Sequence, residues 1–136
     1  MEILTKIKTN CKKYIILWCI FMCYSIIVLY IYKENKLLTL IGNPFTVYIY
    51  IIIILQHENK RFSKFIKIHY KKVWEEAKTW GVGNRIKWSW AFNRKDVGNT
   101  AISDIKEAYI KTILTIYILG ILTFPLFGIV GILLNK

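Results

Sequence analysis

Only a few side chains in this sequence have the chemistry of catalytic or metal-binding residues. The two histidines, His57 and His69, lie 12 positions apart, and neither has a paired ligand nearby. Histidines in such a setting are more often interfacial residues than metal ligands. Glu75 and Glu76 are adjacent, so on a helix their carboxylates point in different directions and balance nearby lysines. These four residues therefore predict no catalytic site and no metal site.

The cysteines and one glycine pair give no recognisable site either. Cys19 and Cys23 lie four residues apart in an uncharged run and share a helix face, without histidine or acidic neighbours that would complete a metal site. We expect the cysteines, Cys11 included, to be small apolar packing residues. Gly81 and Gly83 lack the third glycine of a dinucleotide-binding fingerprint. The sequence thus predicts a protein that is not an enzyme and binds no cofactor.

The composition sets this chain apart from soluble domains of its size. Hydrophobic residues make up 55% of the 136 residues, which is more apolar surface than a small soluble core can bury. Lys and Arg nevertheless number 20, against 8 Asp and Glu. Such an excess of positive charge is expected of a protein that binds nucleic acid. It is also expected of a membrane protein, whose cytoplasmic loops are rich in Lys and Arg under the positive-inside rule. Because the charges flank uncharged runs, the sequence favours the membrane and predicts no nucleic-acid partner.

Three long runs without charge, at 14–32, 37–55 and 112–134, predict three transmembrane helices, at 14–32, 37–57 and 110–134. The first run has 19 residues, which as a helix measures roughly 28 Å and matches the hydrocarbon core of a bilayer. It is too long for a signal peptide and no small-residue cleavage site follows it, so we expect it to be retained. No membrane run contains a charged residue of the kind that marks ion or proton paths, which argues against a transporter.

Prolines and glycines modify two of these helices. Pro44 follows Gly42 and Asn43, so the second helix either begins at Pro44 with Asn43 as its cap or kinks there and still spans. Pro125 is expected to kink the third helix. Three glycines in the third helix allow close approach of another backbone: Gly120, Gly128 and Gly131.

Residues 58–109 form a charged segment with 12 Lys and Arg against six acidic residues. Apolar side chains recur at helical spacing in its first part, with lysines on the opposite side. This pattern predicts a basic amphipathic helix at an anionic membrane surface. The apolar positions are Phe62, Phe65, Ile66, His69, Val73, Trp74, Ala77 and Trp80. The lysines are Lys64, Lys67, Lys71 and Lys78.

The rest of the charged segment has weaker signals. Residues 81–84, Gly-Val-Gly-Asn, end the amphipathic helix. Residues 86–92 alternate apolar and polar side chains, but a single strand would have no partner, so we expect an interfacial loop anchored by Trp88 and Trp90. Asp104 and Glu107 have the spacing of a helix-capping pair, which predicts a helix start just before the third run.

The loop charges predict the orientation of a single membrane domain. Four lysines lie in the arm at 1–13 and 12 basic residues lie at 58–109, whereas the turn at 33–36 has two and the C-terminal tail has only Lys136. By the positive-inside rule the N-terminus and residues 58–109 are cytoplasmic, and the short turn and the C-terminus lie outside.

Polar groups inside the predicted spans are uncharged. Their hydroxyls can return hydrogen bonds to their own helix or reach the interface, or they can form a packing surface for another membrane helix. They are Tyr24, Ser25, Asn43, Thr46, Tyr48, Tyr50, Thr115, Tyr117 and Thr123.

The order of these parts resembles the three-helix immunity proteins against pore-forming colicins of the E-one type. The resemblance is carried by LTFPLFGIVGILLNK at 122–136, where a late proline is followed by two glycines at three-residue intervals and an Asn-Lys tail. It is also carried by HENKRFSKFIKIHYKKVWE at 57–75 and by YKENK at 32–36 after an aromatic-rich first helix.

The resemblance implies a bacterial inner-membrane protein that binds the helices of a pore-forming bacteriocin sideways in the bilayer before the channel opens. Such a protein needs no catalytic residue, and the resemblance points to no particular toxin-binding residue. Its partners would be the toxin helices and the anionic lipid headgroups. The alternatives are a structural subunit of a membrane secretion or conjugation complex, a holin-like protein, and a membrane-tethered nucleic-acid binder whose Trp88 and Trp90 stack on bases.

Overall fold

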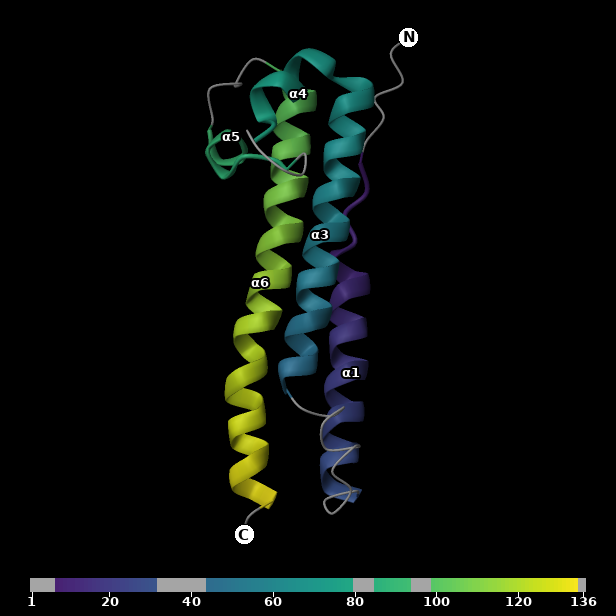
Figure 1. Cartoon of the computed structure of the whole chain (residues 1–136), viewed down its shortest axis with the longest axis vertical. Coiled ribbons are helices and arrows are strands. Elements are labelled where there is room, and N and C mark those ends of the chain that lie inside the picture. Colours follow the sequence, from purple (N-terminus) through teal and green to yellow (C-terminus); the bar gives the residue numbers. More distant parts are fainter. Residues whose placement is uncertain (1–6, 32–43, 80–84, 94–98, 135–136) are drawn as a thin grey trace. The chain divides into compact units, whose positions relative to one another are not determined.

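The computed structural model describes residues 7–31, 44–79, 85–93 and 99–134, and nearly all of them are helical. The helices are α1 (Cys11–Ile31), α3 (Pro44–His69), α4 (Lys71–Ala77), α5 (Trp88–Phe92) and α6 (Thr100–Leu134), as Figure 1 shows. Within these described ranges there is no strand, and a single antiparallel bridge joins Lys78 to Ile86. The prediction of an all-α fold is confirmed.

Two of the described helices are long and apolar enough to cross a membrane. They contain the stretches Cys11–Val28 and Thr100–Leu133. Only 28% and 17% of the residues in these stretches are buried, whereas the core helix of a soluble protein would be mostly buried. Their exposed apolar side chains therefore fit a lipid surrounding, in agreement with a membrane protein.

The second predicted span corresponds to the first half of α3. This helix begins at Pro44, a residue that suits the first turn of a helix because its missing N–H has no partner there. Residues 37–43, including Gly42 and Asn43, lie outside the described part of the chain. The uncharged part of α3 that is described, residues 44–57, is about 21 Å long at the rise of an α-helix.

Helix α6 is longer than the predicted third span. It begins at Thr100, and the side-chain oxygen of Asn99 accepts a hydrogen bond from the Ile102 amide at 3.4 Å. Asn99 is thus the N-cap, and the prediction of a helix start at Asp104 is wrong because a cap five residues earlier already starts the helix. The helix continues through Pro125 to Leu134.

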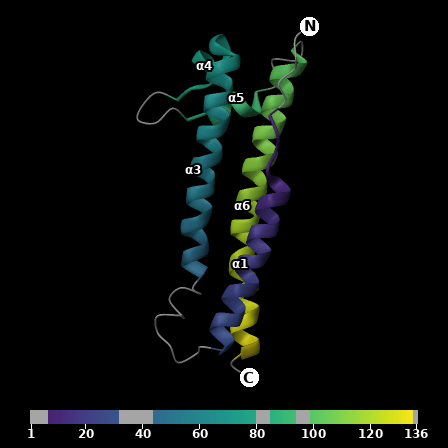
Figure 2. The ribbon, with the colours of Figure 1, turned by 90° about the vertical axis from the view of Figure 1, so that its right-hand side faces the viewer.

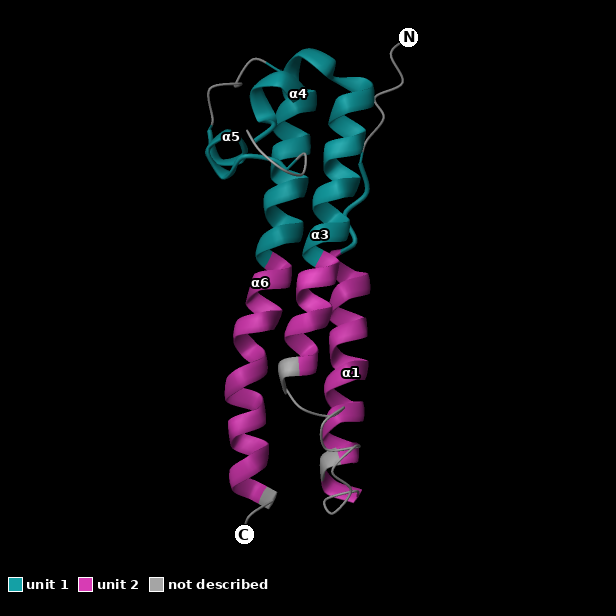
Figure 3. Ribbon diagram, viewed as in Figure 1, with its two compact units in different colours: residues 1–10, 55–114 teal, residues 11–54, 115–136 magenta. Residues whose placement is uncertain are grey.

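The chain divides into two compact units, and α3 and α6 contribute residues to both (Figure 3). Unit 1 contains residues 1–10 and 55–114, and unit 2 contains residues 11–54 and 115–136. In unit 2 the helices α1 and α6 run in the same direction and α3 runs opposite to them (Figures 1 and 2). Alternating direction is what three consecutive crossings of a bilayer require.

Unit 1 has an apolar core of its own, made by residues from four helices. Phe62 of α3, Trp74 of α4 and Tyr109 of α6 are at most 4% exposed, and the rings of Phe62 and Tyr109 meet edge to face with centroids 5.3 Å apart. Trp90 of α5 belongs to the same core. Burial of these aromatic side chains is the main stabilising term available to a unit of this size.

The prediction of one amphipathic helix lying on a membrane surface is wrong in two respects, its bounds and what covers its apolar face. Residues 62–69 continue α3 without a break, and Tyr70 separates them from α4. The apolar face packs on protein instead of a membrane surface: Phe62, Ile66, Trp74 and Ala77 are buried, and Phe65 and Val73 are partly buried. His69 is exposed, and Trp80 lies outside the described residues.

The prediction of an interfacial loop at residues 86–92 is also wrong. Residues 88–92 form the short helix α5, and the backbone before it pairs with the end of α4. The Thr79 amide donates to the Arg85 carbonyl and the Lys87 amide donates to the Ala77 carbonyl, each at 2.8 Å. Residues 85–87 therefore pair with residues 77–79 at the end of α4, a pairing that the sequence did not indicate.

Candidate functional site

Helix α6 is held in unit 2 by hydrogen bonds from both neighbouring helices. The Trp18 indole of α1 donates to the Thr123 hydroxyl at 3.0 Å, and the Tyr48 hydroxyl of α3 donates to the Gly120 carbonyl at 2.9 Å. Thr123 is fully buried and donates to the Leu119 carbonyl in its own helix at 2.8 Å. Both anchors lie within one turn of α6, so this turn joins all three helices of unit 2.

The same turn of α6 allows a close approach of α3. A Cβ atom at Gly120 would lie only 3.2 Å from Cδ1 of Ile51, which is tighter than an ordinary contact. The Tyr48 ring packs one turn away on Phe124, with centroids 5.0 Å apart. Small residues that bring backbones together are typical of helix packing in lipid. The prediction of close approach is therefore confirmed for Gly120.

Helices α1 and α3 leave a narrow apolar cleft of about 460 Å³ between them in unit 2. We call it the α1–α3 slot. The buried side chains of Ile116 and Leu119 from α6 form its floor. The rings of Phe21 and Tyr50 contact each other across it, with centroids 5.1 Å apart. The remaining lining residues are Tyr14, Leu17, Trp18, Ile20, Tyr24, Val47, Ile51 and Ile54.

The outward faces of unit 2 are strongly apolar. Ile16 of α1, Ile53 of α3 and Ile121 of α6 are all more than half exposed, and so are many of their neighbours. Gly128 and Gly131 belong to this surface, because a Cβ at either position would meet no described atom within 4 Å. These two glycines leave room for an approaching helix, whereas Gly120 is already used inside the chain.

The predicted polar positions inside the spans divide into two groups. Tyr48 and Thr123 join helices, as described above, while Tyr24, Tyr50 and Tyr117 are exposed on the unit surface. The Ser25 hydroxyl is fully buried and has no hydrogen-bond partner among the described residues. Thr46 and Thr115 are partly buried, and Asn43 lies outside the described residues.

The cysteines behave differently from one another. Cys11 is buried, in agreement with the expected packing role. Cys19 and Cys23 are exposed, so the expectation that they pack within the chain is wrong: the helix face that they share points away from the other helices. Across the described residues, no three His, Cys, Asp or Glu side chains gather in a way that could hold a metal ion.

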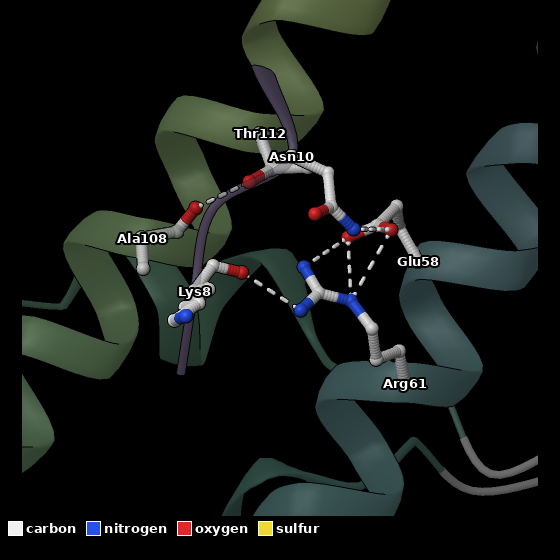
Figure 4. Close-up of polar contacts among 6 residues, drawn as sticks. All are labelled: Lys8, Asn10, Glu58, Arg61, Ala108 and Thr112. Atoms are coloured by element: carbon white, nitrogen blue, oxygen red, sulfur yellow. Dashed lines mark hydrogen bonds and ion pairs between the residues drawn. The ribbon is translucent and has the colours of Figure 1, made fainter. Parts of the chain in front are cut away.

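A buried ion pair lies in unit 1, where α3 leaves its uncharged stretch. The carboxylate of Glu58 is fully buried and accepts a hydrogen bond from Nη2 of Arg61 at 2.6 Å and from Nε at 3.0 Å (Figure 4). The amide of Asn10 donates to the same carboxylate at 3.2 Å. A buried carboxylate needs such partners because leaving it unpaired in a dry interior is costly.

The ion pair fastens the N-terminal arm to α3. Nη1 of Arg61 donates to the backbone carbonyl of Lys8 at 2.7 Å, so Arg61 contacts the arm as well as the acid (Figure 4). Asn10, at the end of the arm, directly precedes α1. The four residues, which we call the polar clasp (Lys8, Asn10, Glu58 and Arg61), thus tie the N-terminal arm to the middle of α3.

Other sequence candidates lie on the surface or in the core of unit 1. His57 and His69 are both exposed, and Glu75 forms a surface ion pair with Lys78. Trp88 is 45% exposed and its ring stacks on Phe92, whereas Trp90 is buried under the ammonium of Lys106 at 4.7 Å. Trp90 therefore packs within the protein and has no free face for a base or a membrane interface.

Sequence reasoning missed the polar clasp and the Trp18–Thr123 pair. The acidic residue Glu58 comes directly after an uncharged run and is followed three residues later by Arg61, a spacing that places the two side chains together on a helix. That spacing could have indicated the ion pair. The Trp18–Thr123 bond joins residues 105 positions apart, and no local pattern signals it.

The described side chains of unit 2 form a helix-packing assembly with apolar outer faces and hydrogen-bonded anchors inside. This arrangement can present a shaped, uncharged surface to another helix or to lipid. Comparison of the chain with protein-family models, with curated proteins and with solved structures finds no match.

Proposed function

We propose that this chain is a three-span protein of the bacterial inner membrane that gives immunity against a pore-forming bacteriocin. It binds the channel helices of the toxin sideways within the bilayer and keeps the channel closed. The N-terminus and residues 58–109 are cytoplasmic and the C-terminus is periplasmic. The proposal rests on the uncharged, exposed helix faces of unit 2 together with the resemblance of residues 57–75 and 122–136 to the colicin immunity proteins.

The exposed apolar surface is the observation that carries the proposal. On α6 the side chains of Ile118, Phe124, Ile129 and Ile132 are each more than half exposed, and Gly128 lies among them with open space around its Cα. In hydrocarbon, apolar area alone gives no preference for protein over lipid, so association depends on shape and close packing. A ridge of large side chains with glycine gaps provides such shape on one helix.

The energy required is within reach of such a surface. Changing the ratio of open to closed channels from 99:1 to 1:99 requires that the protein bind the closed form more tightly than the open form by about 5.5 kcal/mol. Helix contacts in lipid contribute about 1 kcal/mol or less each, so several contacts along one helix face are needed. No ion path and no catalytic group is needed, because the activity consists of binding one state of the toxin.

The test is expression of the chain in sensitive cells followed by challenge with a panel of pore-forming bacteriocins. We expect survival against one member of the panel at normal growth rate, with the protein in the membrane fraction. Sensitivity to the whole panel would contradict the proposal and favour a subunit of a membrane complex. A growth defect with loss of membrane potential on expression alone would favour a holin-like protein.

A matched pair of variants connects protection with the proposed surface. Gly128→Leu fills a gap on the outer face of α6, whereas Leu133→Ile changes an exposed position of the same helix without filling a gap. We expect Gly128→Leu to abolish protection at unchanged membrane levels, and Leu133→Ile to keep it.

A further inference from the structure

The α1–α3 slot of unit 2 has a shape that suits one kind of ligand. It extends along α1 from Tyr14 to Tyr24, which is about 15 Å at the rise of an α-helix. Its volume is about 460 Å³. A long cleft of this kind between two packed helices suits one extended hydrocarbon chain.

The walls of the slot agree with that conclusion. Phe21 and Tyr50 contact each other across it, so an entering helix would have to separate these rings, whereas a flexible chain can lie beside them. The lining is almost wholly apolar, and its one indole N–H, on Trp18, is already bonded to Thr123. A ligand in the slot thus meets hydrocarbon and aromatic surface along its length, without a polar group that it must satisfy.

A positive charge lies at the end of the slot nearest the start of α1. Lys13 precedes the lining residues Leu17, Ile20 and Tyr24 by 4, 7 and 11 positions, which places it on the same helix face. Its side chain is exposed. Lys12 is equally exposed, but its face continues through Ile16, Cys19 and Cys23, none of which lines the slot.

From this geometry we infer that the α1–α3 slot binds one acyl chain of an anionic phospholipid whose headgroup phosphate lies at Lys13. The lipid comes from the leaflet that faces the start of α1, where positive loops and anionic headgroups meet. The bound chain fills the space between α1 and α3 that the side chains leave empty. The inference needs the membrane arrangement proposed above, but it is independent of any bacteriocin.

The test uses the purified full chain taken from nanodiscs of equimolar phosphatidylglycerol and phosphatidylethanolamine, with bound lipid counted by native mass spectrometry. We expect one retained lipid per chain, mostly phosphatidylglycerol. Ile54→Trp, which fills the slot, should lower its occupancy at least fivefold. Ile53→Trp, on the exposed face next to it, should leave the occupancy unchanged.

A second pair of variants tests the headgroup. Lys13→Gln should reduce the preference for phosphatidylglycerol about fivefold, the factor that corresponds to about 1 kcal/mol for one lysine near an anionic surface. Lys12→Gln should leave that preference unchanged. Equal effects of Lys12→Gln and Lys13→Gln would contradict the assignment of the phosphate to Lys13.

A measurement on the unaltered chain keeps the inference testable even if a variant misfolds. A phospholipid with a photoactivatable acyl chain should label Leu17 and Ile51 in preference to Ile16 and Ile53. Uniform labelling, or the same lipid occupancy in Ile54→Trp as in the unaltered chain, would overturn the inference. It would also be overturned if Ile54→Trp broke up a dimer while lipid occupancy stayed the same. Extraction of the chain from membranes by alkaline carbonate would instead contradict the membrane arrangement itself.

Discussion

At the scale of single residues, the hydroxyl and indole groups of unit 2 matter most because lipid surrounds this unit. Hydrocarbon offers no hydrogen-bond partner, so a polar group inside a bilayer is satisfied within the protein. Trp18 and Tyr48 meet this requirement by donating to neighbouring positions on α6. The sequence indicated which residue types could do so, but not the pairs, because partners on different helices have no fixed spacing along the chain.

Tyr48→Phe is expected to weaken the packing of α3 on α6 by about 0.6 kcal/mol, the average contribution of an interhelical hydrogen bond in a membrane protein. Tyr50→Phe, at an exposed tyrosine of the same helix, is the control and should have no measurable effect. The free energy of unfolding in mixed micelles measures both. Equal effects of the two substitutions would contradict the role assigned to the Tyr48 hydroxyl.

Glu58→Ala is expected to destabilise the chain by about 3 kcal/mol, because removing one partner of a buried ion pair leaves Arg61 and Asn10 without their acceptor. Arg61 is 26% exposed and can partly rehydrate, which puts the effect at the lower end of the usual range. Glu75→Ala breaks the surface ion pair with Lys78, in which the Glu75 side chain is 59% exposed and the Lys78 side chain 38% exposed. This substitution should lower the free energy of unfolding by less than about 1 kcal/mol.

Chemical denaturation in detergent compares these two acids directly. A loss for Glu75→Ala as large as that for Glu58→Ala would show that burial does not distinguish the two ion pairs. The spacing of Glu58 and Arg61 could indicate an ion pair, but the sequence could not predict that this pair is buried and that the Glu75 pair is exposed. Only the fold places the Glu58 carboxylate against the N-terminal arm and out of contact with water.

At the scale of elements, the long helices were the most predictable part of the structure and the segment at 58–109 was the least. Uncharged runs at 14–32 and 112–134 correspond to α1 and to the second part of α6, because composition alone decides them. The 3.6-residue periodicity of residues 62–77 correctly indicated an apolar helix face. It could not indicate what covers that face, and the first part of α6 does so in place of a membrane.

Gly120→Leu tests the contact between α3 and α6. The added side chain would collide with Ile51, whose Cδ1 lies 3.2 Å from an ideal Cβ at Gly120. We expect a loss of at least 1–3 kcal/mol, typical of overpacking. The double variant Gly120→Leu with Ile51→Ala should recover part of that loss, since it returns space at the same point.

Gly128→Leu is the control for packing within the chain and should leave the unfolding free energy almost unchanged. Thermal unfolding in detergent, followed by circular dichroism, compares the variants. Equal destabilisation by Gly120→Leu and Gly128→Leu would contradict the distinction between an internal and an external glycine.

At the scale of the whole molecule, charge and apolar surface are arranged as a membrane protein requires. The exposed lysines at 60, 64, 67, 71 and 72 all lie in unit 1, and from Tyr14 to Ile31 and from Thr115 to Leu134 the described residues of unit 2 have no charge. The sequence predicted this separation because uncharged runs and charged loops alternate along the chain. The number of crossings depends on α3, whose described uncharged part is shorter than a full span.

The side of the membrane on which the C-terminus lies tests the three-span arrangement most directly. Alkaline phosphatase fused after Lys136 is active only outside the cytoplasm, and green fluorescent protein at the same position is fluorescent only inside it. Three crossings from a cytoplasmic N-terminus predict an active phosphatase and a dark fluorescent fusion. An inactive phosphatase with a bright fluorescent fusion would mean an even number of crossings and would contradict the proposal that α3 spans the bilayer.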